Sequence, residues 1–151
     1  MKKITLLALP LAALVTLAAA PLCHAEDTPV GLWKNIDDKT GKPKALIRIT
    51  ETGGELSGKI EKLFLDESED KNPKCDKCTG PNKDQPVIGM TILFGLKKDG
   101  DAYSGGKILD PENGKLYSSK LAVVEHNKKL NVRGFIGVPF MGRTQTWLRE
   151  Q

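Results

Sequence analysis

The sequence has few of the side chains on which enzymatic catalysis most often depends. Its 151 residues include three cysteines and two histidines, and they contain no Gly-x-Ser-x-Gly nucleophile motif. His126 stands in a predicted turn, so a serine nucleophile would lack a suitably placed base. Three cysteines are also too few for a disulfide scaffold to replace a hydrophobic core. The sequence therefore favours a protein that is not an enzyme, without catalytic residues, metal or cofactor.

The sequence also lacks a strong excess of positive or negative charge. The formal net charge is +4, with 28% charged and 39% hydrophobic residues. These proportions are typical of a globular chain, and the length suits one domain. Lysines alternate with acidic residues along the chain, so nothing points to nucleic-acid binding. Because no internal repeat and no flexible linker interrupts the sequence, residues 26–151 are predicted to form a single domain.

The one long hydrophobic run lies at the N-terminus. Lys2 and Lys3 precede residues 4–20, which carry no charge. Cys23-His24-Ala25 then places small residues at the third and first positions before a cleavage point. This layout predicts a secretory signal peptide, residues 1–25, that is removed after Ala25. Its removal would lower the formal net charge from +4 to +2.

Two other uses of this segment are weighed against cleavage. The hydrophobic run is marginally short for a permanent membrane anchor. Lipidation of Cys23 would require a small residue before it, and Leu22 stands there. With the signal removed, we expect no stable membrane insertion and a bacterial protein exported to the periplasm.

Helical periodicity is absent after residue 25, and side chains alternate with period two instead. In residues 44–51, for example, Ala45, Ile47 and Ile49 fall on one face. Turn signals such as Gly53-Gly54 and Asn113-Gly114 separate the alternating stretches. The predicted strands are Gly31–Asn35, Lys44–Glu51, Glu55–Leu65, Met90–Lys97, Ala102–Leu109, Lys115–Glu125, Lys129–Gly137 and Arg143–Glu150. The fold class is therefore all-β: a small antiparallel up-and-down barrel of about eight strands.

One connection is much longer than the others. Residues 66–89 are polar, hold three prolines and include Cys75-Asp76-Lys77-Cys78. The alternation slips just before this segment, near residues 62–65, which indicates a bulge or a strand end. In an oxidising compartment the two neighbouring cysteines favour a small disulfide that pins the segment.

Two alternatives remain for the cysteine pair. A thioredoxin-type redox site needs its first cysteine at a helix N-terminus, whereas Thr79-Gly80-Pro81 follows Cys78. A closed zinc site needs four ligands, whereas the mature chain has no third cysteine and one histidine, His126, with Asp76 or Asp84 to assist.

Polar groups suited to holding a ligand come from the second half of the chain. Arg133 and Arg143 stand on neighbouring predicted strands, where they could hold an anionic group together with Gln145. Tyr103 and Tyr117 could add an apolar wall with a hydrogen-bonding tip. The alternative is that the alternation of side chains along the strands leaves Arg133, Arg143 and Gln145 facing solvent.

The first and last predicted strands carry a pair that could close a barrel. Trp33 lies in the first strand and Arg149 in the last, so a closed sheet would let the guanidinium stack on the indole. The alternative is that Trp33 and Trp147 are ordinary core residues and Arg149 is exposed.

The mature chain resembles the secreted bacterial domain-of-unknown-function-2147 family along nearly its whole length. The motifs that carry the resemblance are Gly31-Leu32-Trp33-Lys34, Asp38-Lys39-Thr40-Gly41-Lys42, Cys75-x-x-Cys78, Gly89-Met90, Gly95-Leu96, residues 105–111, Gly114-Lys115-x-Tyr117, residues 132–137 and residues 142–147. The resemblance implies a small exported β-rich domain and brings no established activity. A looser likeness, through Gly31-x-Trp33 and Arg149, is to the lipocalin and streptavidin-like barrels, and it concerns the fold alone.

These observations lead to three functional hypotheses. The first is a non-enzymatic periplasmic barrel that binds a small, lipid-like or anionic molecule at its open mouth. The second is an interaction module for another protein of the cell envelope, which docks through residues 66–89 and has a filled barrel. The third is a thiol-redox protein that uses an accessible Cys75–Cys78 pair.

Overall fold

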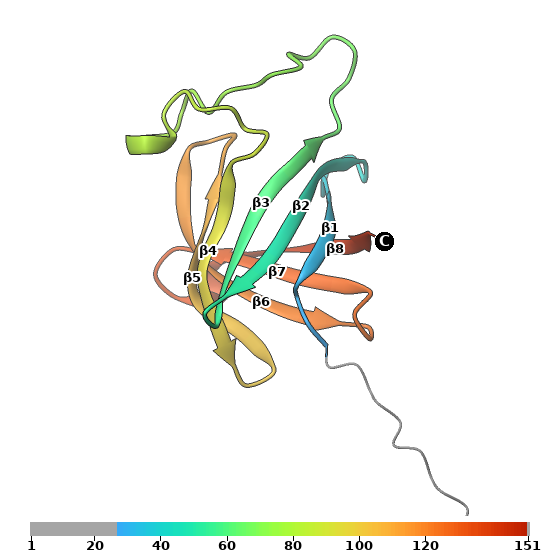
Figure 1. The fold of residues 1–151 in the computed structure, drawn as a ribbon, viewed down its shortest axis with the longest axis vertical. Coiled ribbons are helices and arrows are strands. Elements are labelled where there is room, and N and C mark those ends of the chain that lie inside the picture. The colour runs from blue at the N-terminus through green and yellow to red at the C-terminus, as the bar shows by residue number, and fades with distance from the viewer. Residues whose placement is uncertain (1–26, 151) are drawn as a thin grey trace, which may run out of the picture.

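The computed structural model describes residues 27–150, so the predicted signal peptide and its cleavage after Ala25 lie outside the described residues. Eight antiparallel strands follow one another around a closed barrel, and the last pairs with the first (Figure 1). The strands are β1 Gly31–Ile36, β2 Pro43–Thr52, β3 Glu55–Leu63, β4 Thr91–Asp99, β5 Ala102–Asp110, β6 Lys115–Val124, β7 Lys129–Phe135 and β8 Arg143–Glu150. The predicted all-β barrel is confirmed, and each strand boundary differs from the prediction by at most two residues.

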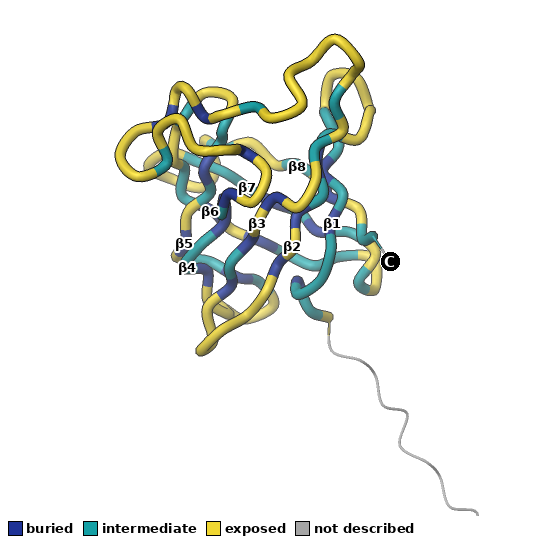
Figure 2. Tube along the Cα trace, turned by 45° about the horizontal axis from the view of Figure 1, so that its top comes forward, coloured by how far each residue is buried: buried dark blue, intermediate teal, exposed yellow. Residues whose placement is uncertain are grey.

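Alternation of side chains explains why these segments form a barrel. On β2 the inward residues Ala45, Ile47 and Ile49 are buried, whereas Arg48 between them points outward and pairs with Glu61 at 2.8 Å. Buried positions follow the strands around the interior, and exposed positions gather on the turns (Figure 2). Closure removes both sheet edges, because every strand then has two neighbours.

The predicted irregularity at the end of the third strand is present, but one residue earlier than expected. Leu46 pairs with Lys62 and Ile47 pairs with Ile60, so Glu61 is an extra residue on β3. This bulge bends the strand near its end, and β3 stops at Leu63.

At one end, which we call the closed end, β1 and β8 meet. Trp33 and Arg149 are partners across this strand pair. The Arg149 guanidinium carbon lies 4.1 Å from the centre of the Trp33 ring, and the indole Nε1 donates to the carbonyl of Pro29 at 2.7 Å.

Arg149 also ties three chain segments together at the closed end. Its guanidinium donates to the carbonyls of Thr28 (2.6 Å), Val30 (3.0 Å) and Asn127 (2.5 Å). Burial lowers the pKa of Arg149 from its ordinary value, although an arginine stays charged in proteins. The residues that precede β1 are thereby fastened beneath the barrel.

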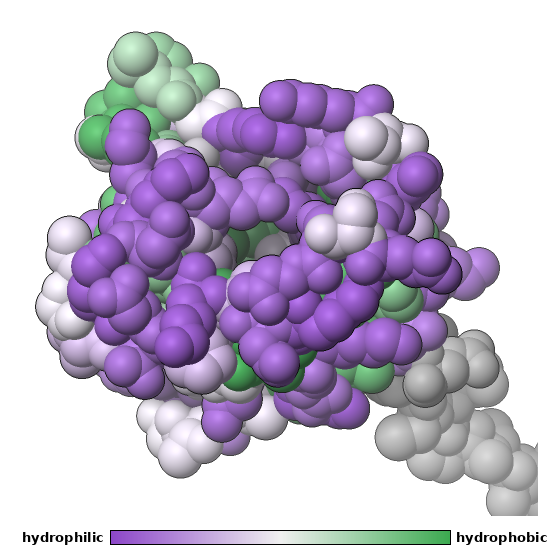
Figure 3. Space-filling model, turned by 90° about the horizontal axis from the view of Figure 1, so that it is seen from above, coloured by the Kyte–Doolittle hydropathy of each residue, from purple (hydrophilic) through white to green (hydrophobic). Residues whose placement is uncertain are grey.

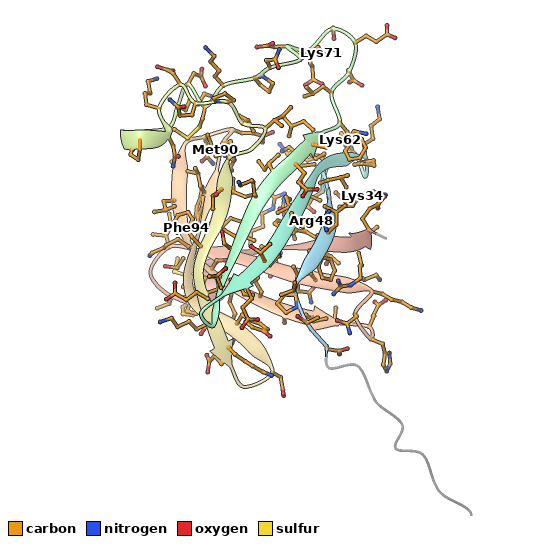
Figure 4. All side chains as sticks on the ribbon, in the orientation of Figure 1. Lys34, Arg48, Lys62, Lys71, Met90 and Phe94 are labelled. Atoms are coloured by element: carbon orange, nitrogen blue, oxygen red, sulfur yellow. A yellow bond between two sulfur atoms is a disulfide. The ribbon has the colours of Figure 1, made fainter. Side chains whose placement is uncertain are left out.

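The opposite end, the open end, is covered by the connection between β3 and β4. This segment, residues 64–90, includes the short 3-10 helix η1 Gly80–Asn82 and the predicted Cys75–Cys78 disulfide, which is confirmed. Figure 4 places Lys71 on its outermost part and Met90 at its return to β4. Both cysteines are buried, at 0% and 2% exposure.

Candidate functional site

A cavity of about 640 Å³ opens at the end of the barrel that residues 64–90 partly cover. Seen from above, the molecule is hollowed there, with a hydrophobic floor inside a hydrophilic ring (Figure 3). Side chains of all eight strands line it, and the covering segment contributes Phe64, Leu65, Pro73 and Val87. The site therefore belongs to the barrel and to its cover together.

The walls of the cavity are apolar because they continue the inward rows of the strands. The apolar strand residues are Ala45, Ile47, Ile60, Leu63, Ile92, Ile108, Leu109, Val132 and Trp147. Apart from Trp147, these side chains are aliphatic, so they offer contact area but no hydrogen bonds. A molecule that enters the space would therefore contact apolar side chains along these walls and polar ones at the mouth.

Trp147 supplies a polar atom among these walls. The residue is only 1% exposed, and its indole Nε1 has no hydrogen-bond partner within the described structure. By contrast, the indole Nε1 of Trp33 at the closed end donates a hydrogen bond to the carbonyl of Pro29. A buried donor without a partner is unfavourable. Trp147 lines the cavity, although its Nε1 exposes less than 1 Å². A bound molecule that reached this atom would supply the missing acceptor.

A short chain of polar side chains leads from the interior to the rim. Asn35 is buried beside Trp33 on the inward row of β1, and its Nδ2 donates to Gln145 Oε1 at 3.1 Å. Gln145 Nε2 in turn donates to Asp38 Oδ2 at 3.4 Å, and Arg143 forms an ion pair with the same oxygen. Asp38 raises the pKa of Arg143 through this hydrogen bond and its charge.

Charges of both signs surround the mouth. The charged lining residues are Asp37, Lys39, Lys44, Glu69, Lys74, Asp76, Asp110, Glu112 and Arg143. Several are neutralised within the ring, as when Lys44 Nζ lies 2.5 Å from Glu112 Oε1. At Asp37, hydrogen bonds from the backbone N–H and hydroxyl of Thr40 lower the carboxyl pKa. The mouth is therefore polar but not strongly cationic, which gives a purely anionic ligand little advantage.

The structure brings three of the five predicted ligand residues to the cavity. Arg143, Gln145 and Tyr117 line it, whereas Arg133 and Tyr103 do not. Arg133 lies between the inward residues of β7 and faces outside, where it donates to the carbonyl of Pro139 at 2.6 Å. Tyr103 lies near the closed end, beside a small pocket that includes Thr28 and Lys98.

Sequence reasoning missed Asn35 and Asp38 and left Trp147 as a residue of the core. The position of Asn35 could have been predicted from the alternation of side chains. Asn35 follows Trp33 by two residues on β1, so both side chains point inward. The role of Asp38 was not readable, since it depends on the fold of the β1–β2 turn beside β8.

The covering segment is seated on the turn between β5 and β6. Lys77 Nζ donates to the carbonyl of Glu112 at 3.0 Å, and Cys75 Sγ lies 3.3 Å from the carbonyl oxygen of Pro111. At Gly114 the two backbones approach so closely that a Cβ would overlap the carbonyl of Lys77. The disulfide therefore helps to hold one wall of the cavity in place.

Comparison with known proteins agrees with this architecture. Residues 31–149 match the model of a family described as uncharacterized proteins conserved in bacteria, DUF2147. The chain belongs to this family. No curated protein matches the chain. The fold of this DUF2147 chain is similar to that of protein HP1028 from Helicobacter pylori, which is described as a member of the lipocalin family. The TM-score of the match is 0.68. The match covers 81% of this chain and 82% of HP1028 at 22% identity, which shows a shared lipocalin-like fold.

Two searches of the described residues complete the site. Among residues 27–150, no group of three or more His, Cys, Asp or Glu side chains is arranged to hold a metal ion. In the same residues there is no helix that is long and apolar enough to cross a membrane.

Proposed function

We propose that this DUF2147 chain is an exported, periplasmic binding protein for a small and mostly apolar molecule that carries a hydrogen-bond acceptor. The observation that carries the proposal is a cavity of about 640 Å³ whose apolar walls include Trp147, a residue with a buried Nε1–H that has no partner. Cavities of roughly 300–1,000 Å³ hold drug-sized ligands, usually through apolar contacts and a few placed polar groups. A carbonyl, ester or carboxylate oxygen would accept from Trp147.

The other two hypotheses have less support. An interaction module with a filled barrel has no use for a cavity of this size. A thiol-redox protein needs accessible sulfurs, whereas Cys75 and Cys78 are buried against the β5–β6 turn. Both features favour a structural disulfide that shapes a binding site.

Export rests on the layout of residues 1–25 and agrees with a disulfide, which persists in oxidising compartments. Expression of the full coding sequence in a bacterium tests it directly. The expected product is periplasmic and begins at Glu26, as mass analysis would show. A product that is cytoplasmic and keeps residues 1–25 would contradict this part of the proposal.

Binding is tested with three probes of equal chain length: an alkane, a fatty acid and its methyl ester. All three should raise the thermal unfolding midpoint, because each binds only the folded barrel. The fatty acid and the ester should bind up to about tenfold more tightly than the alkane, the value of one net hydrogen bond. Trp147→Phe keeps the aromatic wall and should abolish this difference.

A filled cavity provides the control. Ala45 is a small, buried residue of the cavity wall, so Ala45→Phe would occupy part of the space. This variant should bind all three probes weakly while it retains its β-sheet spectrum. If none of the probes binds the unaltered protein, the proposed function is wrong.

A further inference from the structure

The loop between β7 and β8 carries four of the eight large hydrophobic residues that are exposed in the described structure. We call residues 136–142 the apolar loop. Ile136 is 67% exposed, Val138 44%, Phe140 80% and Met141 72%. Figure 3 shows hydrophobic side chains projecting at the upper left of the mouth. Folding gains nothing from side chains left in water, so a cluster of this kind indicates a contact with another body.

The loop is built to present these side chains. Its 3-10 turn η2 Pro139–Met141 is closed by bonds from Met141 N to the Val138 carbonyl (3.1 Å) and from Gly142 N to the Pro139 carbonyl (3.2 Å). Arg133 Nε also donates to the Pro139 carbonyl at 2.6 Å. The apolar side chains are therefore held outward by an ordered backbone, which lowers the entropy lost on binding.

The outer face of the barrel beside the apolar loop carries unpaired positive charge. Lys120 and Arg133 are partners across β6 and β7, and Lys107 lies on β5 with its Nζ on the hydroxyl of Ser118. Among the described residues, none of these three cations forms a salt bridge. Arg133 donates only to neutral oxygens, those of Pro139 and Thr144.

From these features we propose that the apolar loop and the cationic outer face dock the protein on a lipid bilayer that contains anionic lipids. Shallow insertion of a few apolar side chains together with basic residues is the combination that holds proteins at such surfaces. A protruding tip suits a bilayer better than a protein partner, whose interface needs about 800 Å² on each side. Gly134 and Arg143 flank the loop and line the cavity, so docking would bring the mouth beside the membrane.

Vesicle flotation tests the docking independently of any ligand in the cavity. The full chain is expressed, and each variant is compared with the unaltered protein so that the N-terminus is the same throughout. Vesicles that contain phosphatidylglycerol should carry the protein, and vesicles of phosphatidylcholine alone should carry much less. Added salt should weaken the binding, because it screens the basic residues. Phe140→Ser with Met141→Ser should lower the partition coefficient about tenfold or more.

Matched substitutions separate the docking face from net charge and from general hydrophobicity. Lys120→Glu should weaken binding by about fivefold or more, at roughly 1 kcal/mol per basic residue. Lys59→Glu makes the same change on the exposed side of β3, across the barrel, and should have little effect. Leu148→Ser removes an exposed apolar residue that is 38% exposed on β8 and should also leave flotation unchanged.

Three results would overturn the proposal. The first is failure of the unaltered protein to float with anionic vesicles. The second is equal loss of binding in Lys59→Glu and Lys120→Glu, which would mean that net charge alone acts. The third is a dimer in sedimentation that the Phe140→Ser and Met141→Ser changes dissociate, which would assign the apolar loop to a second copy of the chain.

Discussion

The two ends of the barrel use the same pair of residue types in opposite ways. At the closed end, Trp33 and Arg149 stack on each other and donate to backbone carbonyls. On the wall of the cavity that opens at the other end, Trp147 keeps a buried N–H without a partner, and Arg143 pairs with a carboxylate at the rim. The closed end satisfies these polar groups internally, whereas a residue of the cavity wall keeps a donor without a partner. We therefore expect the closed end to contribute mainly to stability and the cavity to contribute to the proposed binding.

The largest expected difference between the ends concerns the two arginines of β8. Arg149→Leu would remove the donors to the carbonyls of Thr28, Val30 and Asn127. We expect it to lower the free energy of unfolding by about 3 kcal/mol, because partly buried acceptors lose their partners. Arg143→Leu breaks an exposed ion pair and should cost less than about 1 kcal/mol. Urea unfolding measures both, and equal losses would contradict the division between the ends.

The two tryptophans sharpen the same comparison. Trp33→Phe leaves the Pro29 carbonyl without its donor and should cost about 2 kcal/mol. Trp147→Phe removes an N–H that has no partner, so it should cost less than about 1 kcal/mol or stabilise slightly. Thermal and urea unfolding of the two variants would compare them. A larger loss from Trp147→Phe would show that its N–H already has a partner in the protein.

Local pattern was enough to predict the closed end and much of the barrel. Alternation around Ala45, Ile47 and Ile49 marks the inward row of β2, and turn residues mark where the strands reverse. The outward position of Arg133 was also readable, since it stands between Val132 and Gly134 on β7. These features depend on neighbouring residues, and period two reports them directly.

The open end could not be derived from the sequence, because it depends on contacts between distant segments. Asp38 reaches the rim only because the β1–β2 turn folds beside β8, where Gln145 donates to it. Whether the interior is hollow depends on how residues 64–90 settle on the turn at Gly114. Neither contact leaves a periodic signal in the chain.

A third, smaller effect tests how the open end is covered. Gly114 has a positive φ of 70° and packs on the Lys77 carbonyl, so Gly114→Ala should displace the covering segment. The Cys75–Cys78 disulfide should then be reduced faster by dithiothreitol.

Gly100 in the β4–β5 turn provides the control, because it has a φ of 61° and open space around it. Gly100→Ala should cost about 1 kcal/mol of stability from backbone strain alone and leave the reduction rate unchanged. Equal reduction rates in the two variants would mean that Gly114 does not seat the cover.

The smallest effect is a pH dependence at the rim of the open end. Hydrogen bonds from Thr40 and the Lys39 backbone lower the pKa of Asp37 below its ordinary value of 3.8. A carboxyl whose pKa is lower in the folded state stabilises the fold above the unfolded pKa. That contribution disappears as the pH falls below 3.8 and through the folded pKa. Thermal unfolding between neutral pH and strong acid should therefore show a steeper acid decline in the unaltered protein than in Asp37→Asn. The amide of Asp37→Asn keeps an acceptor oxygen for Thr40 but does not titrate in this range. If the two proteins lose stability equally as the pH falls, ionised Asp37 does not stabilise the turn at the mouth.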